Sequence, residues 1–175
     1  MFVVSISGAQ GTGRTTLARA VGEAVSSPVF SRDILLSARR DSGYPVETME
    51  DLQRLSSAGY RLQGALIGQQ LSLGQPAIVE CIAPEAVRGP WRRIAGSHGA
   101  RFLFVDCVVS DRDLHQRRLE ERETTGAGGW RRIEWREVEA TLVGLGAPAA
   151  GCVVADAVHP VAANVERIVA ALAEP

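Results

Sequence analysis

Glycines and one threonine near the start of the chain have the types and spacing of a phosphate-binding loop. In the pattern G-x-x-x-x-G-K-[ST], Gly8, Gly13 and Thr15 occupy fixed positions, and Arg14 replaces the lysine. Glycines expose backbone N–H groups and permit positive φ, so successive amides can bind phosphate oxygens. The hydroxyl of Thr15 is placed to ligate Mg²⁺. The expected phosphate contacts are Gly8, Ala9, Gln10, Gly11, Thr12, Gly13, Arg14, Thr15 and Thr16.

Arg14 is the one departure from this pattern. The chain contains no lysine, and all 19 of its basic residues are arginine, so Arg14 fits a replacement that runs through the whole chain. Arginine is a planar fork, whereas lysine is a compact charge, and the two grip a phosphate differently. Two interpretations stay open: an enzyme with an altered contact to the nucleotide, or a nucleotide-binding module with little turnover.

The elements around the loop predict the fold class. Residues 2–6 form an apolar run typical of a buried strand, and residues 15–21 begin a helix. Further short apolar strands alternate with helices along the chain, at residues 28–31, 77–79, 101–109 and 152–155. This alternation predicts an α/β fold of three layers, a five-stranded parallel sheet flanked by helices. In such folds ligands bind at the carboxyl ends of the strands, where Asp33, Glu80 and Asp156 are expected.

Residues 48–72 have helical periodicity with an interruption at Gly59, which predicts two helices. The leucines expected to face the core from this region are Leu52, Leu55, Leu62, Leu66 and Leu73. Because His98, His115 and His159 lack metal-ligand spacing, they are expected at the surface or at helix caps. An odd number of cysteines without paired spacing argues against a disulfide framework or a zinc site, and Cys81, Cys107 and Cys152 are expected to be core thiols.

Length and charge narrow the class of partner. With 175 residues a single domain is expected, and a net charge of −1 gives no overall basic field for nucleic acid or membrane. No apolar run approaches the length of a membrane span, and no signal peptide is recognised at the N-terminus, so the cytoplasm is the expected location. The oligomeric state stays open, a homodimer included.

Four motifs give the chain a resemblance to the P-loop kinase superfamily, and more closely to the small kinases grouped with polynucleotide 5′-hydroxyl kinase, chloramphenicol phosphotransferase and zeta-toxin-type kinases. They are GAQGTGRTT, SRD after the second strand, VECIAPEAVR and DLHQRRLEERETTG. The resemblance implies a three-layer P-loop NTPase fold over residues 1–175, with ATP and Mg²⁺ as cofactors. It also implies an acceptor-binding helical segment at about residues 34–74 and a lid at about residues 117–130.

The resemblance also assigns roles. Asp33 corresponds to the acid that orients the attacking hydroxyl, and Glu80 to the acid that supports the metal or the acceptor; in place of these roles, Asp33 could be a helix cap and Glu80 a solvated acid. Arg118 and Arg122 match the lid arginines that close over the phosphates, although they could also form a solvated helix face. Weaker assignments place adenine stacking at Arg117 and acceptor contacts at Arg39, Arg40 and Arg88.

These features lead to the hypothesis of an ATP-dependent kinase that phosphorylates a hydroxyl of a small molecule: a nucleoside, nucleotide, sugar or antibiotic-like alcohol. The catalytic residues would be Asp33, Arg14, Arg118 and Arg122, and the metal ligands Thr15 and Glu80. The alternatives are a nucleotide-binding regulatory module with little turnover and a nucleic-acid 5′-hydroxyl kinase, which the near-neutral charge disfavours. The sequence does not name the acceptor, and it does not separate ATP from GTP.

Overall fold

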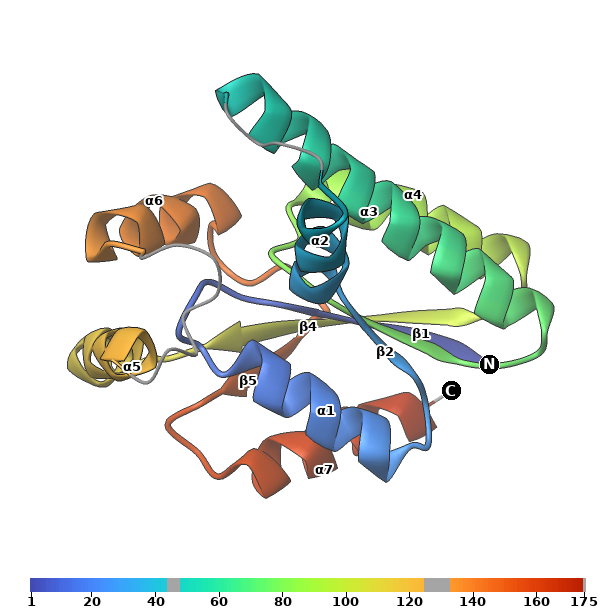
Figure 1. Cartoon of the computed structure of the whole chain (residues 1–175). Coiled ribbons are helices and arrows are strands. Elements are labelled where there is room, and N and C mark those ends of the chain that lie inside the picture. Colours follow the sequence, from blue (N-terminus) through green and yellow to red (C-terminus); the bar gives the residue numbers. More distant parts are fainter. Residues whose placement is uncertain (44–47, 125–132, 175) are drawn as a thin grey trace.

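The computed structural model describes residues 1–43, 48–124 and 133–174. Strands and helices alternate along nearly the whole chain (Figure 1). In chain order the elements are β1 Phe2–Ser7, α1 Arg14–Ala24, β2 Val29–Ser31, α2 Arg32–Asp41, α3 Met49–Ser72, β3 Ala77–Glu80, α4 Glu85–Ser97, β4 Arg101–Val108, α5 Arg112–Thr124, α6 Trp135–Leu145, β5 Val153–Asp156 and α7 Val161–Ala173.

All strand pairs in the sheet are parallel, in the order β2-β3-β1-β4-β5. Helices α1 and α7 cover one face, and α3 and α4 cover the other (Figure 1). Strand β1 is the central strand, and its residues alternate between two apolar clusters, with Val3 packed toward α3 and α4 and Val4 and Ile6 toward α1 and α7. The predicted α/β class with a five-stranded parallel sheet between helical layers is confirmed.

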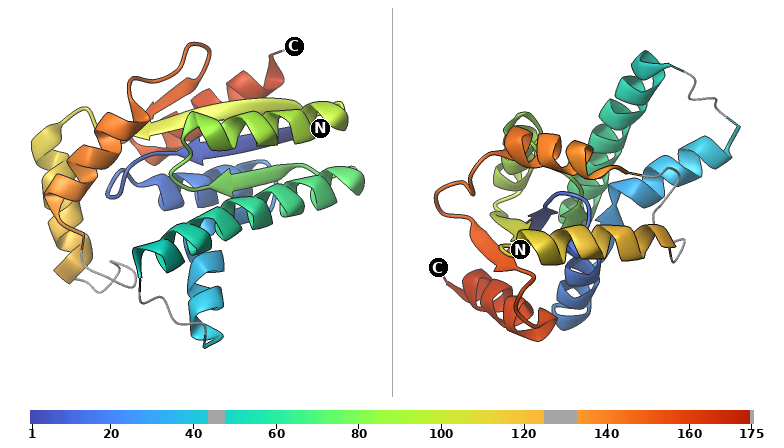
Figure 2. Two further views of the ribbon diagram at one scale, coloured as in Figure 1. Left: turned by 90° about the horizontal axis from the view of Figure 1, so that it is seen from above. Right: turned by 90° about the vertical axis from the view of Figure 1, so that its left-hand side faces the viewer.

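Helices α5 and α6 lie together beyond the carboxyl ends of the central strands, on the side where β1 enters the glycine-rich loop (Figures 1 and 2). They meet the loop through a small apolar cluster in which Leu119 and Val138 pack with Ala9. The loop is therefore supported by the sheet on one side and by these two helices on the other. No helix within the described ranges combines the length and apolar character that crossing a membrane requires.

The predicted break at Gly59 is wrong, because α3 is one helix of 24 residues. It begins at a capping box in which the side chain of Thr48 accepts a hydrogen bond from the Asp51 amide at 3.1 Å. Gly59 lies inside the helix at a close contact with α2: a Cβ there would approach Arg32 Cγ and Leu36 Cδ2 to 2.9 Å. The glycine thus serves helix packing and does not end the helix.

The predicted core face of this segment is also wrong in part. Leu62 is 46% exposed and Leu73 is 64% exposed, while Gln63, Ile67 and Leu71 are buried. These three residues follow one another at intervals of four, which is the helical repeat of a single face. The polar Gln63 belongs to that face because its amide nitrogen donates to the carbonyl oxygens of Phe30 and Glu80, at 2.8 and 3.2 Å.

Candidate active site

The glycine-rich loop joins the end of β1 to the start of α1. Gly11 and Gly13 have φ values of +82° and +78°, which residues with side chains rarely adopt. A Cβ at Gly8 would collide with the carbonyl oxygen of Cys107. Thr12 donates its hydroxyl to the carbonyl of Ala9 at 2.9 Å, which holds the loop in a compact turn. The loop has the backbone geometry of an anion-binding nest that opens onto a helix N-terminus.

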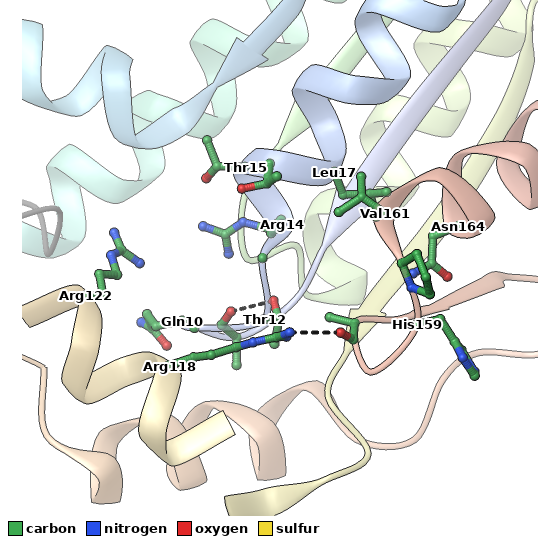
Figure 3. A pocket seen from close by; sticks show the side chains of 16 residues that line it. Gln10, Thr12, Arg14, Thr15, Leu17, Arg118, Arg122, His159, Val161 and Asn164 are labelled. Carbon is green, nitrogen blue, oxygen red and sulfur yellow. Dashed lines mark hydrogen bonds between the residues drawn. The ribbon is translucent and has the colours of Figure 1, made fainter. Parts of the chain in front are cut away.

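A cavity of about 680 Å³ opens above this loop (Figure 3). The loop and the first turn of α1 form one wall, and Arg118 and Arg122 approach from α5. The opposite wall is the segment after β5, and its lining residues are Ala157, His159, Pro160, Val161 and Asn164. The phosphate loop therefore lies at one end of a cavity whose other end is formed by β5 and α7, which is enough space for a nucleotide.

Arg14 connects the loop to the neighbouring strands. Its side chain is buried; Nε donates to Glu80 Oε1, Nη1 donates to the Gly8 carbonyl at 2.5 Å, and Nη2 donates to Asp33 Oδ2 at 3.3 Å. Burial by itself would lower the pKa of Arg14, but the charges of Glu80 and Asp33 outweigh burial and raise it. The guanidinium therefore stays charged and fixed between the ends of β1, β2 and β3.

Glu80 is almost completely buried at the end of β3. Burial alone would raise its pKa, but the charge of Arg14 and the hydrogen bonds from Arg14 and Thr15 lower it, so Glu80 is ionised at neutral pH. The Thr15 hydroxyl lies 3.4 Å from Glu80 Oε1, and Glu80 Oε2 is buried without a hydrogen-bond partner among the described residues. An unpartnered carboxylate oxygen beside a threonine hydroxyl fits Mg²⁺, which prefers oxygen ligands and retains several waters.

Asp33 lies in the first turn of α2, and its side chain is 54% exposed while it keeps its contact with Arg14. Of the predicted acceptor contacts, Arg88 is buried on α4, with its guanidinium carbon 3.6 Å from the centre of the Phe104 ring and its Nε donating to the Ala83 carbonyl at 2.6 Å. The side chains of Arg39 and Arg40 lie outside the described part of the structure, as do residues 44–47 of the predicted acceptor segment.

The lid arginines are placed differently from one another. Arg118 extends across the cavity and donates from Nη2 to the Ala157 carbonyl at 3.1 Å, so it links α5 to the segment after β5 (Figure 3). Arg122 lines the cavity one helical turn further on. Arg117 is exposed and is not among the residues that line this cavity. Residues 125–130 of the predicted lid lie outside the described residues.

Histidines and an asparagine near the cavity were missed at the level of sequence. His115 is buried and does not lie at the surface; its Nε2 is 2.6 Å from the Gln10 carbonyl, and its ring meets the edge of Trp135. His159 and Asn164 line the end of the cavity at β5 and α7, and Asn164 donates to the Asp156 carbonyl at 2.8 Å. The sequence position of His159 and Asn164 after the last strand could have indicated that they lie near the site, because all carboxyl ends of a parallel sheet meet at one edge.

Cys81 and Cys107 are buried in the core as predicted, whereas Cys152 is only partly buried. Burial raises the pKa of Cys81 to about 12 and that of Cys107 to about 11. Their thiols are therefore protonated at neutral pH and are poor nucleophiles. Within the described residues, no group of three or more histidine, cysteine or acidic side chains could hold a metal ion by itself.

A parallel sheet with a phosphate-loop motif directly after its central strand is the arrangement of the P-loop fold. The model of one family, described as an AAA domain (AAA_33), matches residues 3–141, and the chain belongs to this family. A comparison with curated proteins finds no significant match.

Solved structures share the fold over nearly the full chain. A candidate kinase from Chloroflexus aurantiacus has a TM-score of 0.79 at 18% identity, covering 98% of this chain and 95% of the other. A gluconokinase from Sinorhizobium meliloti 1021 has a TM-score of 0.66 at 22% identity, covering 98% and 91%. An APS kinase from Mycobacterium tuberculosis, in complex with AMPPNP and APS, has a TM-score of 0.70 at 15% identity, covering 99% and 98%. At these identities the likeness concerns the fold.

Proposed function

We propose that the chain is an ATP-dependent kinase that uses Mg²⁺ to transfer the γ-phosphoryl group to a hydroxyl of a small molecule. One observation carries this proposal: Arg14 of the phosphate loop is within hydrogen-bond distance of Asp33 and contacts Glu80. The cation that would meet the transferring phosphate and the carboxylate that would orient a hydroxyl are therefore neighbours at the junction of β1, β2 and β3. A site that only stored nucleotide would not need that junction.

Each group has a task in such a transfer. The bare amides of residues 8–15 would hold the nucleotide phosphates, and Thr15 and Glu80 Oε2 would provide oxygen ligands for Mg²⁺. When bound, the metal neutralises charge on the outer phosphate oxygens. Asp33 accepts a hydrogen bond from the acceptor hydroxyl and points its oxygen toward the γ-phosphorus. Arg118 and Arg122 bring positive charge over the cavity from α5.

The acceptor belongs to the range of small alcohols that suits this fold: a nucleoside, nucleotide, sugar or antibiotic-like alcohol. Support comes from the proteins of similar fold, which include a gluconokinase, a sugar kinase and an APS kinase. Asp33 pairs with Arg14 at the start of α2, and the neighbouring Arg32 contacts Tyr60 of α3, so an acceptor held beside Asp33 would lie near these two helices. An acceptor there would approach the γ-phosphoryl group from the side of β2.

A second candidate function is nucleotide binding with little turnover, and the contacts of Arg14 favour it. Its Nε, Nη1 and Nη2 each donate to a protein oxygen, so phosphate contacts require either the remaining N–H groups or the loss of one of these bonds. A lysine at this position would have no planar fork to be held in this way. The two functions therefore differ in whether Arg14 can form hydrogen bonds to the phosphate during transfer.

The test is release of ADP from ATP and Mg²⁺ in the presence of a library of small alcohols, with mass detection of the phosphorylated product. Asp33→Asn is expected to lower kcat on the order of 10²-fold or more, as loss of a general base does, while nucleotide affinity is retained. Glu166→Gln is the matched control, because Glu166 is an exposed carboxylate on α7.

The binding-module alternative predicts another pattern. Nucleotide would bind with Mg²⁺, no alcohol would be phosphorylated, and Arg14→Lys would leave the protein inactive. Phosphorylation of an alcohol that does not depend on Asp33 would leave the kinase assignment standing and would refute the proposed role of this carboxylate.

A further inference from the structure

Arg32 is a cation beside the proposed acceptor site that neither the motif nor the proposed mechanism uses. It is the first residue of α2 and directly precedes Asp33. Its guanidinium carbon lies 4.6 Å from the centre of the Tyr60 ring, within the range of a cation–π contact. Its Nε is shielded from solvent and has no hydrogen-bond partner among the described residues. A hydrogen-bond donor that is shielded from solvent and has no acceptor destabilises the protein, unless a water or a ligand accepts its hydrogen bond.

Arg14 and Arg32 differ in the number of carboxylates with which each forms an ion pair. Four charged side chains act on the thiol of Cys81 at the end of β3: Arg14, Arg32, Glu80 and Asp33. Both carboxylates, Asp33 and Glu80, form their ion pairs with Arg14. In the part of the chain that the structure describes, no carboxylate forms an ion pair with Arg32. Beside Asp33, therefore, the positive charge of Arg32 pairs with no carboxylate among the described residues.

The position of Arg32 is built into the packing of α2 against α3. The helices approach closely because residue 59 is glycine, where a Cβ would come within 2.9 Å of Arg32 Cγ. Tyr60, under the guanidinium, is itself anchored: its hydroxyl donates to the Ile82 carbonyl at 2.7 Å, and its ring meets Trp91 at an angle of 61°. The aromatic face thus fixes the plane of the guanidinium.

We propose that Arg32 binds an anionic group of the phosphate acceptor, so that the substrate is an alcohol that also carries a carboxylate, phosphate or sulfate. This inference rests on the proposed kinase function. The guanidinium edge forms paired hydrogen bonds with two oxygens of the anion, which also satisfy the buried Nε. Because Asp33 follows Arg32 directly on α2, anchoring the anion places the reacting hydroxyl of the same molecule near Asp33. Specificity follows, because a neutral alcohol would offer the guanidinium no negative group to bind.

The first experiment compares matched acceptors that differ in charge: sugar acids with the corresponding alditols, sugar monophosphates with free sugars, and nucleoside monophosphates with nucleosides. The anionic member of at least one pair is expected to have the higher kcat/KM. Arg32→Gln is expected to lower kcat/KM for that acceptor roughly 10- to 100-fold, mainly through KM, which is the range for losing hydrogen bonds to a charged group. The KM for ATP stays unchanged, and Arg32→Lys retains part of the preference for the anion.

The pair that shows the preference identifies the source of the anion, a carboxylate in sugar acids or a phosphate in the other two pairs. Arg167→Gln is the control, because Arg167 is an exposed arginine on α7. Thermal unfolding of each variant shows whether Arg32→Gln has disturbed the packing on Tyr60, in which case Arg32→Lys decides. Equal use of charged and neutral acceptors would overturn the proposal. So would equal losses in kcat for both, because Arg32 would then act on Asp33 and not on the acceptor.

A binding experiment separates this inference from the kinase function. The phosphate loop is first filled with a non-hydrolysable ATP analogue and Mg²⁺, and gluconate, ribose 5-phosphate and inorganic sulfate are then titrated by calorimetry. The inference predicts that at least one anion binds to the loaded protein and that Arg32→Gln abolishes this binding. If no alcohol is phosphorylated but the anion binds through Arg32, the kinase proposal fails and the anion site stands. If alcohols are phosphorylated but no anion binds through Arg32, only the anion site fails.

Discussion

The guanidinium of Arg14 and the carboxylate of Glu80 form a buried ion pair that joins the phosphate loop to the end of β3. The two residues are 66 positions apart in the sequence, and their exposed fractions are 6% and 1%. Arg14 replaces the lysine of the loop pattern, and its guanidinium contacts the carboxylate of Glu80 at the edge of the sheet. Both charges are buried, and each is the main counter-ion of the other. The two positions are therefore expected to be energetically coupled.

Glu80→Gln is expected to destabilise the protein strongly, because it leaves a buried guanidinium with only the partly exposed Asp33 as counter-ion. Breaking a buried ion pair by removing one partner costs about 3 to 5 kcal/mol. Urea unfolding followed by circular dichroism measures the change. The exposed Glu166→Gln serves as control and is expected to stay close to wild type. Equal unfolding free energies for the two variants would contradict the buried pair.

The same pair predicts non-additivity. Arg14→Met alone strands a buried carboxylate, whereas Arg14→Met with Glu80→Gln removes both charges together. The double variant is therefore expected to lose less stability than the sum of the two single variants, because replacing a whole buried pair by uncharged groups is often nearly neutral. The coupling energy is read from a double-mutant cycle in urea, and simple additivity would mean that the residues act independently.

The stability of the protein at acid pH is expected to depend on the ionisation of Glu80. Burial opposes its ionisation, but the charge of Arg14 and the hydrogen bonds to Oε1 lower its pKa below the ordinary 4.5. A group whose pKa is lower in the folded than in the unfolded state stabilises the fold fully above the unfolded pKa, and this stabilisation is lost as the pH falls through the folded pKa. Wild type is therefore expected to lose more stability than Glu80→Gln below about pH 4.5, as measured by urea unfolding across that range.

The phosphate loop and the layer architecture could be predicted from the sequence because they are local properties. The apolar run, the glycine spacing around Gly8 and Gly13 and the following helix all lie within one short stretch. The alternation of short apolar strands with helices then restricts the sheet to a parallel one. Asp33 and Glu80 were placed at the same sheet edge by that topology, and the structure puts both in contact with Arg14.

The missed features depend on contacts between distant segments. His115 is buried because α5 lies beside the phosphate loop, and its sequence neighbours are mostly charged. Gly59 suggested a helix break because an isolated glycine costs about 1 kcal/mol in a helix, but the close approach of α2 requires a residue without a side chain. In both cases tertiary packing decided an outcome that local propensity argued against.

Arg118 is expected to matter more for turnover than for nucleotide affinity. It already crosses the cavity to the Ala157 carbonyl, a neutral partner that it can exchange for phosphate oxygens as charge develops during transfer. Arg118→Ala is expected to lower kcat on the order of 10²-fold, as the loss of one donor to a transition-state oxyanion does. Arg167→Ala is the matched control on α7. Calorimetry of nucleotide binding accompanies the kinetics, and a loss confined to affinity would assign Arg118 to binding alone.

The thiols are expected to differ in their reactivity. Burial raises the pKa of Cys81 to about 12 and that of Cys107 to about 11, and both side chains are shielded from reagents. Cys152 is only partly buried. A disulfide reagent added to native protein near neutral pH should therefore modify Cys152 first, and Cys81 and Cys107 only after unfolding. Mass spectrometry of the labelled peptides gives the order, and early labelling of Cys81 would show that the end of β3 opens.

Gly59→Ala is expected to destabilise the protein although alanine is the better helix former by about 1 kcal/mol. The new methyl group would lie 2.9 Å from Arg32 Cγ and Leu36 Cδ2, so α2 must move away from α3 or the Arg32 stem must shift on Tyr60. Gly68→Ala in the same helix is the control, because its nearest neighbour, Ile94 Cγ2, would be at 3.8 Å, an ordinary contact.

Urea unfolding of the two variants is therefore expected to give changes of opposite sign, with Gly68→Ala more stable than wild type. If both substitutions stabilise the protein, the contact between α2 and α3 is looser than the structure shows. In that case Arg32 would not be held against Tyr60 by packing. Its orientation toward an acceptor would then depend on the ligand, since the free protein would no longer fix the plane of the guanidinium.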